Sequence, residues 1–312
     1  MILVLSNPAS GQNKRDRGLG ARLRAILPPE HRFEQPAGPE QTEELIRGID
    51  RADVELVCVN GGDGTLAHVL SAMCRVWGEE GLPPVAILRG GTMNTVAHGI
   101  GLRGRPEAIL ARVLRRHQAG QPQPSTVRHL MRVDDGQGPP RYGFLFGNGV
   151  ISNYLEVYYE GGRATPVRAL LILARAMLSA MVGGAFARAL VRPTQVRVSL
   201  DGRPWTPERW VSVAAGSVDD IGFGFRAFAR VVRAPGKLQA LGFACSTAAI
   251  ALRIPGTLWG RAWNHPQIED HLGERLELVS DEPIAYMIEG DFHRGGQRVR
   301  VEVGPALTLV TR

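Results

Sequence analysis

The chain has 312 residues, of which 44% are hydrophobic and 21% charged, a balance that is typical of a globular protein and excludes a disordered one. Its three cysteines, Cys58, Cys74 and Cys245, have neither disulfide nor zinc-site spacing, which indicates buried thiols in a reducing compartment. The net charge of +7 comes almost entirely from arginine, since only Lys14 and Lys237 are lysines.

This positive charge favours an anionic partner such as a nucleotide or an acidic membrane surface. The arginines form no block and aromatic residues are only 6% of the chain, so we expect no nucleic-acid partner. The first apolar stretch, residues 1–5, is too short for a signal peptide, and no run of 18 apolar residues follows. We therefore expect a cytoplasmic protein that makes transient, peripheral contact with a membrane surface.

The first predicted unit is a strand, a turn and a helix. Residues 2–5 are apolar and predict a buried strand, and a basic helix is expected from Lys14 to Leu27. In the turn between them, Ser10 offers a hydroxyl and Gly11 an unobstructed N–H group, which suits a phosphate. An ordinary turn with a capping serine is the alternative. A short strand around Phe33 and a helix over residues 41–49 complete this region.

The second unit carries the most specific signal. An apolar strand over residues 54–60 leads into Gly61-Gly62-Asp63-Gly64-Thr65, and apolar residues at helical spacing follow from Leu66 to Val76. Glycines let backbone N–H groups approach a phosphate closely, and Thr65 can cap the helix. A carboxylate at Asp63 repels phosphates unless it holds a metal or takes a proton. The turn therefore indicates phosphate chemistry, with a helix-capping acid as the alternative for Asp63.

A third strand over residues 85–88 delivers a further glycine turn, Arg89 to Thr95, and a helix is predicted from Pro106 to Gln118. Strands that alternate with helices at this spacing predict a parallel α/β sheet. Such a sheet binds ligands at the carboxyl ends of its strands, where all three turns are expected to meet.

The pattern changes near residues 120–125, which we interpret as a linker. Short alternating strands are predicted beyond it, over residues 195–200, 210–214, 276–279, 284–288 and 299–303. They indicate a mainly antiparallel second domain, a β-sandwich. The apolar segment Pro166–Val191 is predicted to be a helix, either buried between layers or forming the wall of an acyl-chain pocket or an interfacial helix.

Three elements together resemble a known family. They are Asn7-Pro8-Ala9-Ser10-Gly11, Gly61-Gly62-Asp63-Gly64-Thr65-Leu66 and Gly91-Thr92-Met93-Asn94. In order and spacing they resemble the diacylglycerol kinase catalytic family, which includes bacterial lipid kinases and sphingosine kinases. The second element is shared with NAD kinases, whereas the first and third favour the lipid-kinase branch. The resemblance is clear over residues 1–100 and weaker near Glu289-Gly290-Asp291.

The resemblance implies an ATP-dependent kinase that acts on a lipid hydroxyl with Mg²⁺, and a homodimer is one candidate assembly. It also implies an NAD kinase-like α/β domain with a parallel sheet over residues 1–125, and a β-sandwich lipid domain over residues 126–295. The C-terminal strands, residues 296–312, would return to the first domain. The nucleotide site would be formed by Asn7, Pro8, Ser10, Gly11, Gly61, Gly62, Asp63, Gly64, Thr65, Gly91, Thr92 and Asn94.

The family's late Asp-Gly-Glu element supplies a general base and a metal-linked acid, and it is reversed here as Glu289-Gly290-Asp291. We assign Asp291 as the base and keep Asp63 as the alternative, with both late acids expected on one strand face. A second acidic turn of the family is replaced by residues 234–239, so the metal ligands stay unassigned. An NAD kinase-like enzyme and a non-catalytic lipid- or nucleotide-binding protein remain alternative functions.

Overall fold

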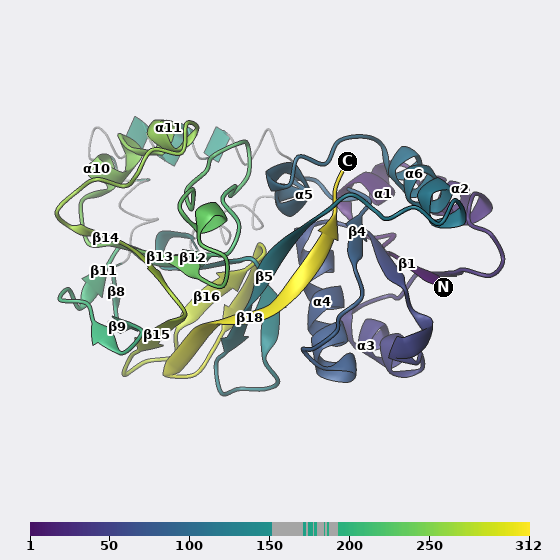
Figure 1. The fold of residues 1–312 in the computed structure, drawn as a ribbon. Helices are drawn as coiled ribbons and strands as arrows, with labels where there is room; N and C mark the ends of the chain where they lie inside the picture. The colour runs from purple at the N-terminus through teal and green to yellow at the C-terminus, as the bar shows by residue number, and fades with distance from the viewer. Residues whose placement is uncertain (152–170, 173, 177, 180–183, 185, 187–192) are drawn as a thin grey trace. The chain divides into compact units, whose positions relative to one another are not determined.

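A computed structural model of the chain describes residues 1–151, 171–172, 174–176, 178–179, 184, 186 and 193–312 (Figure 1). The contacts divide the chain into two compact units. Unit 1 comprises residues 1–128 and 305–312, and unit 2 comprises residues 129–304. The long C-terminal strand β18 (Arg298–Val310) contributes to both units.

Unit 1 is built on a parallel sheet. Its strand order is β2 (Arg32–Glu34), β1 (Ile2–Ser6), β3 (Leu56–Asn60), β4 (Val85–Ile87), and the end of β18 lies beside β4. Every residue of β1 and β3 is buried, which agrees with their continuous apolar runs. Burying a Val, Leu or Ile side chain stabilises a fold by about 1.5–3 kcal/mol, so these two strands form much of the unit's core.

Four of the helices of unit 1 pack in two pairs. The helices of the unit are α1 (Gly11–Arg15), α2 (Leu19–Ala25), α3 (Pro39–Arg47), α4 (Asp63–Trp77), α5 (Thr95–Gly99) and α6 (Pro106–Gln118), with the 3₁₀ turn η1 (Arg51–Asp53). Helix α3 packs against α4, where Arg75 and Glu43 form an ion pair of 2.6 Å. Helix α2 packs against α6, where Arg22 and Glu107 are 2.9 Å apart.

The helix predicted from Lys14 to Leu27 is wrong in one respect, because it is two helices. Helix α1 ends at Arg15 and α2 begins at Leu19, with a turn between them. The carboxylate of Asp16 in this turn accepts a hydrogen bond from Nη1 of Arg22, a contact that the local pattern did not predict. By contrast, α6 has the predicted bounds.

Unit 2 contains two antiparallel sheets. The first has the order β10 (Arg203–Pro204), β9 (Arg197–Leu200), β15 (Arg275–Val279), β18, and β5 (Ser125–Asp134) pairs with β18 and with β6 (Arg141–Gly143). The second has the order β14 (Ile268–Gly273), β13 (Leu238–Phe243), β12 (Ser212–Gly216), β7 (Leu145–Asn148), β16 (Ala285–Ile288), β17 (Asp291–Arg294). A small pair joins β8 (Thr194–Gln195) to β11 (Arg209–Trp210).

The two sheets of unit 2 share one hydrophobic core. Val198, Leu276 and Val299 come from the first sheet, whereas Tyr286 and Ile288 come from the second, and all five belong to one buried cluster. Side chains that alternate along each strand fill the space between the sheets, which is the arrangement of a β-sandwich. The predicted second domain type is therefore present.

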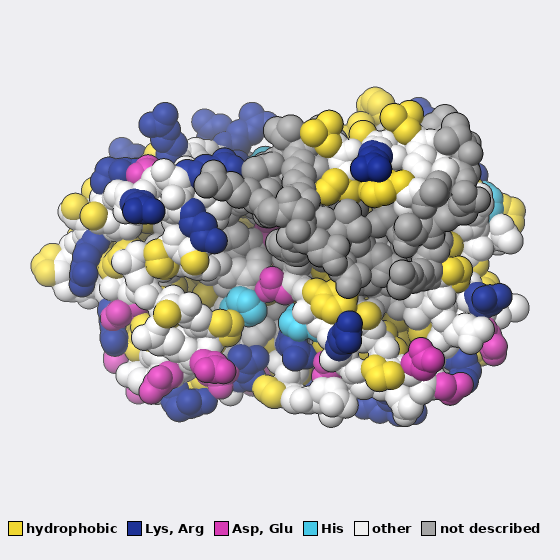
Figure 2. All heavy atoms as spheres, turned by 180° about the vertical axis from the view of Figure 1, so that it is seen from behind, with side chains coloured by type: hydrophobic (Ala, Val, Ile, Leu, Met, Phe, Trp, Pro, Cys, Tyr) yellow, Lys and Arg dark blue, Asp and Glu magenta, His cyan; other side chains and the backbone are white. Residues whose placement is uncertain are grey.

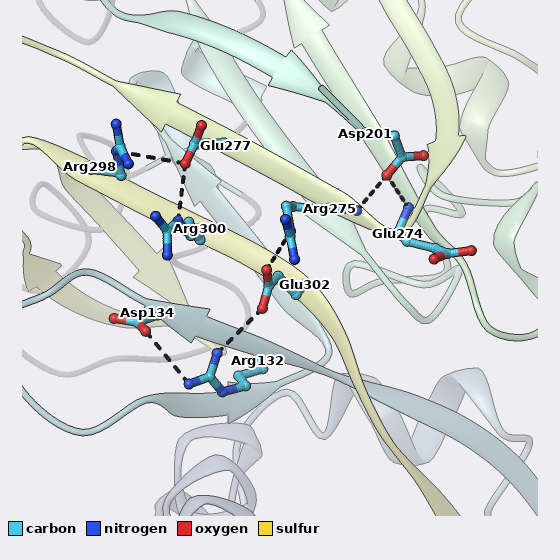
Figure 3. Close-up of polar contacts among 9 residues, drawn as sticks. All are labelled: Arg132, Asp134, Asp201, Glu274, Arg275, Glu277, Arg298, Arg300 and Glu302. Atoms are coloured by element: carbon cyan, nitrogen blue, oxygen red, sulfur yellow. Dashed lines mark hydrogen bonds and ion pairs between the residues drawn. The ribbon is translucent and has the colours of Figure 1, made fainter. Parts of the chain in front are cut away.

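The first sheet of unit 2 carries paired charges on its strands (Figure 3). Glu277 and Arg300, which are register partners on β15 and β18, are 3.1 Å apart, and Arg275 pairs with Glu302 at 2.5 Å. Exposed cross-strand pairs of this kind contribute roughly 0.2–1 kcal/mol each. On the face drawn in Figure 2, Lys and Arg side chains lie at many separate places with Asp and Glu among them. Nearby carboxylates thus neutralise part of the positive charge of the arginines.

Two short helices of unit 2, α10 (Thr247–Ala251) and α11 (Ile254–Thr257), were not predicted, and a 3₁₀ turn η2 (Val231–Arg233) precedes β13. The predicted helix Pro166–Val191 falls largely outside the described residues. Within the part of the chain that is described, no helix has the length and hydropathy needed to span a bilayer.

Candidate functional site

In unit 1 the turns after β1 and β4 are hydrogen-bonded to each other. The hydroxyl of Ser10 donates to the carbonyl of Gly90 at 2.9 Å, and Gln12 N–H donates to the same carbonyl at 3.0 Å. A Cβ atom on Gly11 would stand 2.0 Å from Oγ1 of Thr92, so a larger residue would force the Thr92 side chain to move. The sequence predicted that Ser10 contacts the nucleotide, whereas its hydroxyl here joins two turns.

The turns after β1 and β3 are joined by asparagine side chains. Nδ2 of Asn7 donates to Oγ1 of Thr65 at 2.9 Å, and Asn7 N–H donates to the carbonyl of Asn60 at 2.9 Å. Fully buried Asn60 donates from Nδ2 to Oγ of Ser6 at 2.9 Å. Pro8 stands exposed on the first turn. Sequence reasoning missed Asn60, although a polar residue closing an apolar strand was a usable signal.

The backbones of the second turn, after β3, and the third turn, after β4, are in direct contact. A Cβ atom on Gly91 would lie 2.2 Å from Cα of Gly62, and one on Gly61 would lie 2.4 Å from Cβ of Thr65. Asn94, in the left-handed conformation at φ 52°, accepts from Gly91 N–H through Oδ1 at 3.0 Å. The predicted residues of the second and third turns therefore form one packed cluster, in which a Cβ atom at Gly61 or Gly91 would collide with its neighbours.

Asp63 lies at the first position of α4 and binds another helix. Its carboxylate accepts hydrogen bonds from the N–H groups of Thr95 at 3.1 Å and Val96 at 3.3 Å, at the start of α5. Burial raises the pKa of the Asp63 carboxyl, while these hydrogen bonds oppose the rise. The helix-capping interpretation of Asp63 thus describes its contacts, although it caps α5 and not its own helix.

The N-terminus of α4 is suited to an anion. The helix begins at Asp63 after the N-cap residue Gly62, so the N–H groups of Gly64 and Thr65 have no acceptor within the helix. The helix dipole adds positive potential at this end. Thr65 was predicted to cap the helix and does not, because it lies inside the first turn and Gly62 occupies the cap position.

Arg89 is a cation beside this cluster that sequence reasoning did not select. It occupies positive φ, 61°, between the end of β4 and Gly90. Its Nη2 atom is 2.7 Å from Nε2 of His98, which must be the acceptor because a guanidinium only donates. A non-glycine residue at positive φ is uncommon and costs on the order of 1 kcal/mol or more, so the surrounding structure must hold Arg89 in this conformation.

In unit 2 the late acidic element is a hairpin turn. Glu289 at φ 49° and Gly290 at φ 87° form the two-residue loop between β16 and β17, as a type I′ turn requires. The expectation that both acids share a strand face is therefore wrong. Glu289 is 7% exposed, and its Oε1 accepts from Leu145 N–H at 2.8 Å and also from Phe144 N–H. Asp291 begins β17 and is partly exposed.

The first part of this chain matches a known protein family. Residues 1–121 match the family model of the diacylglycerol kinase catalytic domain. This confirms the family resemblance. The chain also resembles a curated protein, probable diacylglycerol kinase 3 of Caenorhabditis elegans, with 36% identity over 97 residues. That match covers 31% of this chain and only 12% of the longer relative.

The solved structures extend the likeness to the whole fold. A diacylglycerol kinase of Bacillus anthracis has a TM-score of 0.65 at 15% identity, covering 100% of this chain and 96% of its own. A putative diacylglycerol kinase of the same organism has a TM-score of 0.69 at 15% identity, covering 100% and 97%. The predicted fold class, a parallel α/β domain with a mainly antiparallel second domain, is confirmed.

Residues 234–239 replace the metal-linked acidic turn of the family that the chain resembles. Their side chains are not suited to bind a cation. Lys237 is one of these residues, and its Nζ atom lies 2.6 Å from Oε1 of Glu274. Gln239 donates to Oδ1 of Asp270 at 2.7 Å, and the same carboxylate pairs with Arg230 at 3.0 Å. Among the described residues no group of three His, Cys, Asp or Glu side chains is placed to hold a metal.

Proposed function

We propose that this chain is an ATP-dependent lipid kinase that transfers the γ-phosphate to the hydroxyl of a diacylglycerol-like or sphingoid lipid. The observation that carries the proposal is the packed cluster of three turns at the carboxyl ends of β1, β3 and β4, within the region that matches the diacylglycerol kinase catalytic domain. Residues 1–125 would bind the nucleotide and residues 126–295 the lipid.

The nucleotide phosphates bind to backbone N–H groups in this proposal. Gly64 and Thr65 supply N–H groups from the first turn of α4, and the glycines at 11, 61, 62 and 91 keep side chains out of the way. Asn7, Ser10, Thr92 and Asn94 hold the turns in register. Mg²⁺, when bound with the nucleotide, neutralises charge on the transferred phosphoryl group, and a nucleotide-borne ion needs few protein carboxylates.

Proton transfer is assigned to the acidic hairpin. The lipid hydroxyl oxygen bonds to the γ-phosphorus, the bond from that phosphorus to the bridging oxygen breaks, and ADP leaves. The hydroxyl proton passes to the carboxylate of Asp291, which is the more exposed acid of the hairpin. Glu289 acts as a positioning residue, since its carboxylate accepts hydrogen bonds from the backbone N–H groups of Phe144 and Leu145, where β7 begins. Transient contact with a membrane surface and a cytoplasmic location accompany this function.

The experiment supplies radiolabelled ATP and Mg²⁺ with diacylglycerol, sphingosine, phosphatidylglycerol or NAD in parallel. It compares the wild type with Asp291→Asn, Asp63→Asn and the control Asp281→Asn, which alters a carboxylate that is 94% exposed. We expect label in a lipid from the wild type and the control, and a loss of at least about a hundredfold in Asp291→Asn.

Label in NAD alone would replace the lipid kinase by an NAD kinase-like function. Nucleotide binding without transfer to any acceptor would favour a non-catalytic binding protein. If Asp291→Asn keeps its activity while Asp63→Asn loses it and still folds, the base assignment moves to Asp63.

A further inference from the structure

Unit 2 exposes a group of large apolar side chains around α10 and α11. Leu252 is 66% exposed, Leu258 41% and Trp259 71%, although all three lie within eight consecutive residues. Apolar side chains scattered singly over a surface are ordinary, whereas a local concentration of them marks an interaction site. We call residues 246–264, which carry these side chains, the α10–α11 segment.

The α10–α11 segment is firmly attached to unit 2, so its exposed residues are presented by a fixed scaffold. Trp263 is 6% exposed, donates from Nε1 to the carbonyl of Ala227 at 2.9 Å, and packs edge-on against Phe243. Arg253 donates to the carbonyls of Ala249 at 2.8 Å and Asn264 at 3.2 Å. These contacts fix the α10–α11 segment on unit 2.

A second apolar projection lies next to this segment. Phe223 is 40% exposed at φ 55°, between Gly222 at 113° and Gly224 at 80°, and Ile221 in the same turn is 44% exposed. A bulky aromatic residue at positive φ is strained, so the fold holds it at the tip at a cost. The N–H of Arg226, just after this turn, donates to the carbonyl of Thr257 in α11 at 2.9 Å.

The charged side chains within the α10–α11 segment itself have one sign. The α10–α11 segment contains Arg253 and Arg261 and no acidic residue, and the guanidinium of Arg261 lies 6.0 Å from the ring centre of Trp259. Tryptophan and leucine flanked by arginine are typical of surfaces that enter the headgroup region of a bilayer, where the rings lie at the interface and the cations meet anionic headgroups. A symmetric contact between two copies would bring the same arginines together, which is unfavourable.

We propose that the α10–α11 segment, with the adjacent Phe223 turn, docks this protein on an anionic lipid membrane. The proposal deepens the proposed function by locating the surface that reaches the lipid, but docking itself requires neither ATP nor catalysis. Trp259 and the leucines insert among the headgroups, and Arg253 and Arg261 contact lipid phosphates.

The test is co-sedimentation of the full chain, without nucleotide, with vesicles of phosphatidylcholine alone or mixed with phosphatidylglycerol. We expect binding to the anionic vesicles that weakens with salt, and at least about a tenfold loss of partitioning in the double variant Leu252→Ser, Trp259→Ala. Val127→Ser removes an apolar side chain that is 55% exposed elsewhere and should leave binding unchanged. Circular dichroism and thermal unfolding of each variant establish that it is folded.

Fluorescence supplies an independent measurement. Of the five tryptophans Trp259 is exposed, whereas Trp77 and Trp205 are half-buried and Trp210 and Trp263 are buried. Vesicle binding should therefore shift the emission of Trp259 to the blue, and brominated lipid should quench it. The single variant Trp259→Phe should keep binding and lose most of this signal.

Three results would overturn the proposal. The first is a wild type that does not bind to anionic vesicles, and the second is a folded double variant that binds to them as well as the wild type does. The third is a wild-type dimer that the double variant disrupts. A failed kinase assay leaves the vesicle result standing, and failed vesicle binding leaves the kinase assay standing.

Discussion

In unit 1, Oδ2 of Asp63 accepts a 3.1 Å hydrogen bond from the backbone N–H of Thr95. This contact joins the first turn of α4 to the first turn of α5, and with it the second glycine turn to the third. An acid that the sequence sets among the glycines of the second turn is therefore also part of the scaffold that holds them.

Replacing Asp63 should reveal this structural role separately from catalysis. Asp63→Ala removes the acceptor for two N–H groups, and we expect the free energy of unfolding to fall by about 1–2 kcal/mol, as for lost helix caps. Urea unfolding followed by circular dichroism measures it. Glu40→Ala removes an exposed first-turn acid of α3 and serves as the control. An equal loss in both variants would contradict the cap.

Gly91→Ala should disturb the proposed nucleotide site more than the fold. Its Cβ atom would lie 2.2 Å from Cα of Gly62, and because that neighbour is backbone, the two turns must separate. We expect a destabilisation of about 1–3 kcal/mol and a marked loss of ATP binding by calorimetry. Gly138→Ala, in a loop of unit 2 where no atom lies within 4 Å of the added carbon, should bind ATP normally. Normal ATP binding by Gly91→Ala would show that the close approach is dispensable.

Two substitutions of Arg89 separate the effect of its backbone strain from the effect of its charge. At φ 61°, Arg89→Gly should raise the free energy of unfolding by about 1 kcal/mol relative to Arg89→Ala, because glycine adopts this conformation without penalty. Both variants lose the cation beside the turns and should lower kcat/KM for ATP to a similar extent. Steady-state kinetics and urea unfolding together test this. If the alanine variant alone loses activity, the role of Arg89 is conformational.

Acid stability of unit 2 should depend on Asp135. Burial alone would raise the pKa of this carboxyl, but hydrogen bonds from the Tyr286 hydroxyl and Gln137 N–H, with the Arg141 ion pair, outweigh it and hold the pKa below 3.8. A depressed acid pKa adds stability above the unfolded value, and that stability is lost as pH falls through the folded pKa.

Wild type should accordingly lose more unfolding free energy than Asp135→Asn when the pH is lowered from well above 3.8 to below it. Thermal unfolding across this range provides the measurement, and Asp281→Asn provides an exposed-carboxylate control. Parallel pH curves for wild type and Asp135→Asn would refute the assignment.

Much of unit 1 was predictable because its elements are local. The apolar runs of β1 and β3 are continuous and fully buried, and α6 begins at a proline in its first turn. These three elements can be recognised without knowledge of distant contacts. The break between α1 and α2 and the short helices α10 and α11 were missed, because a few residues at helical spacing do not distinguish one helix from two.

The sequence by itself determined the three turns after apolar strands and the glycines that they require, because strand, turn and helix signals lie within a few adjacent residues. Only the tertiary structure decided what the polar side chains of those turns do. Ser10 donates to the carbonyl of Gly90, and Asp63 accepts from the N–H group of Thr95. The same holds in unit 2, where the buried carboxylate of Glu289 accepts from the N–H group of Leu145. Each of these contacts joins residues more than 30 positions apart, and local periodicity carries no information about such pairs.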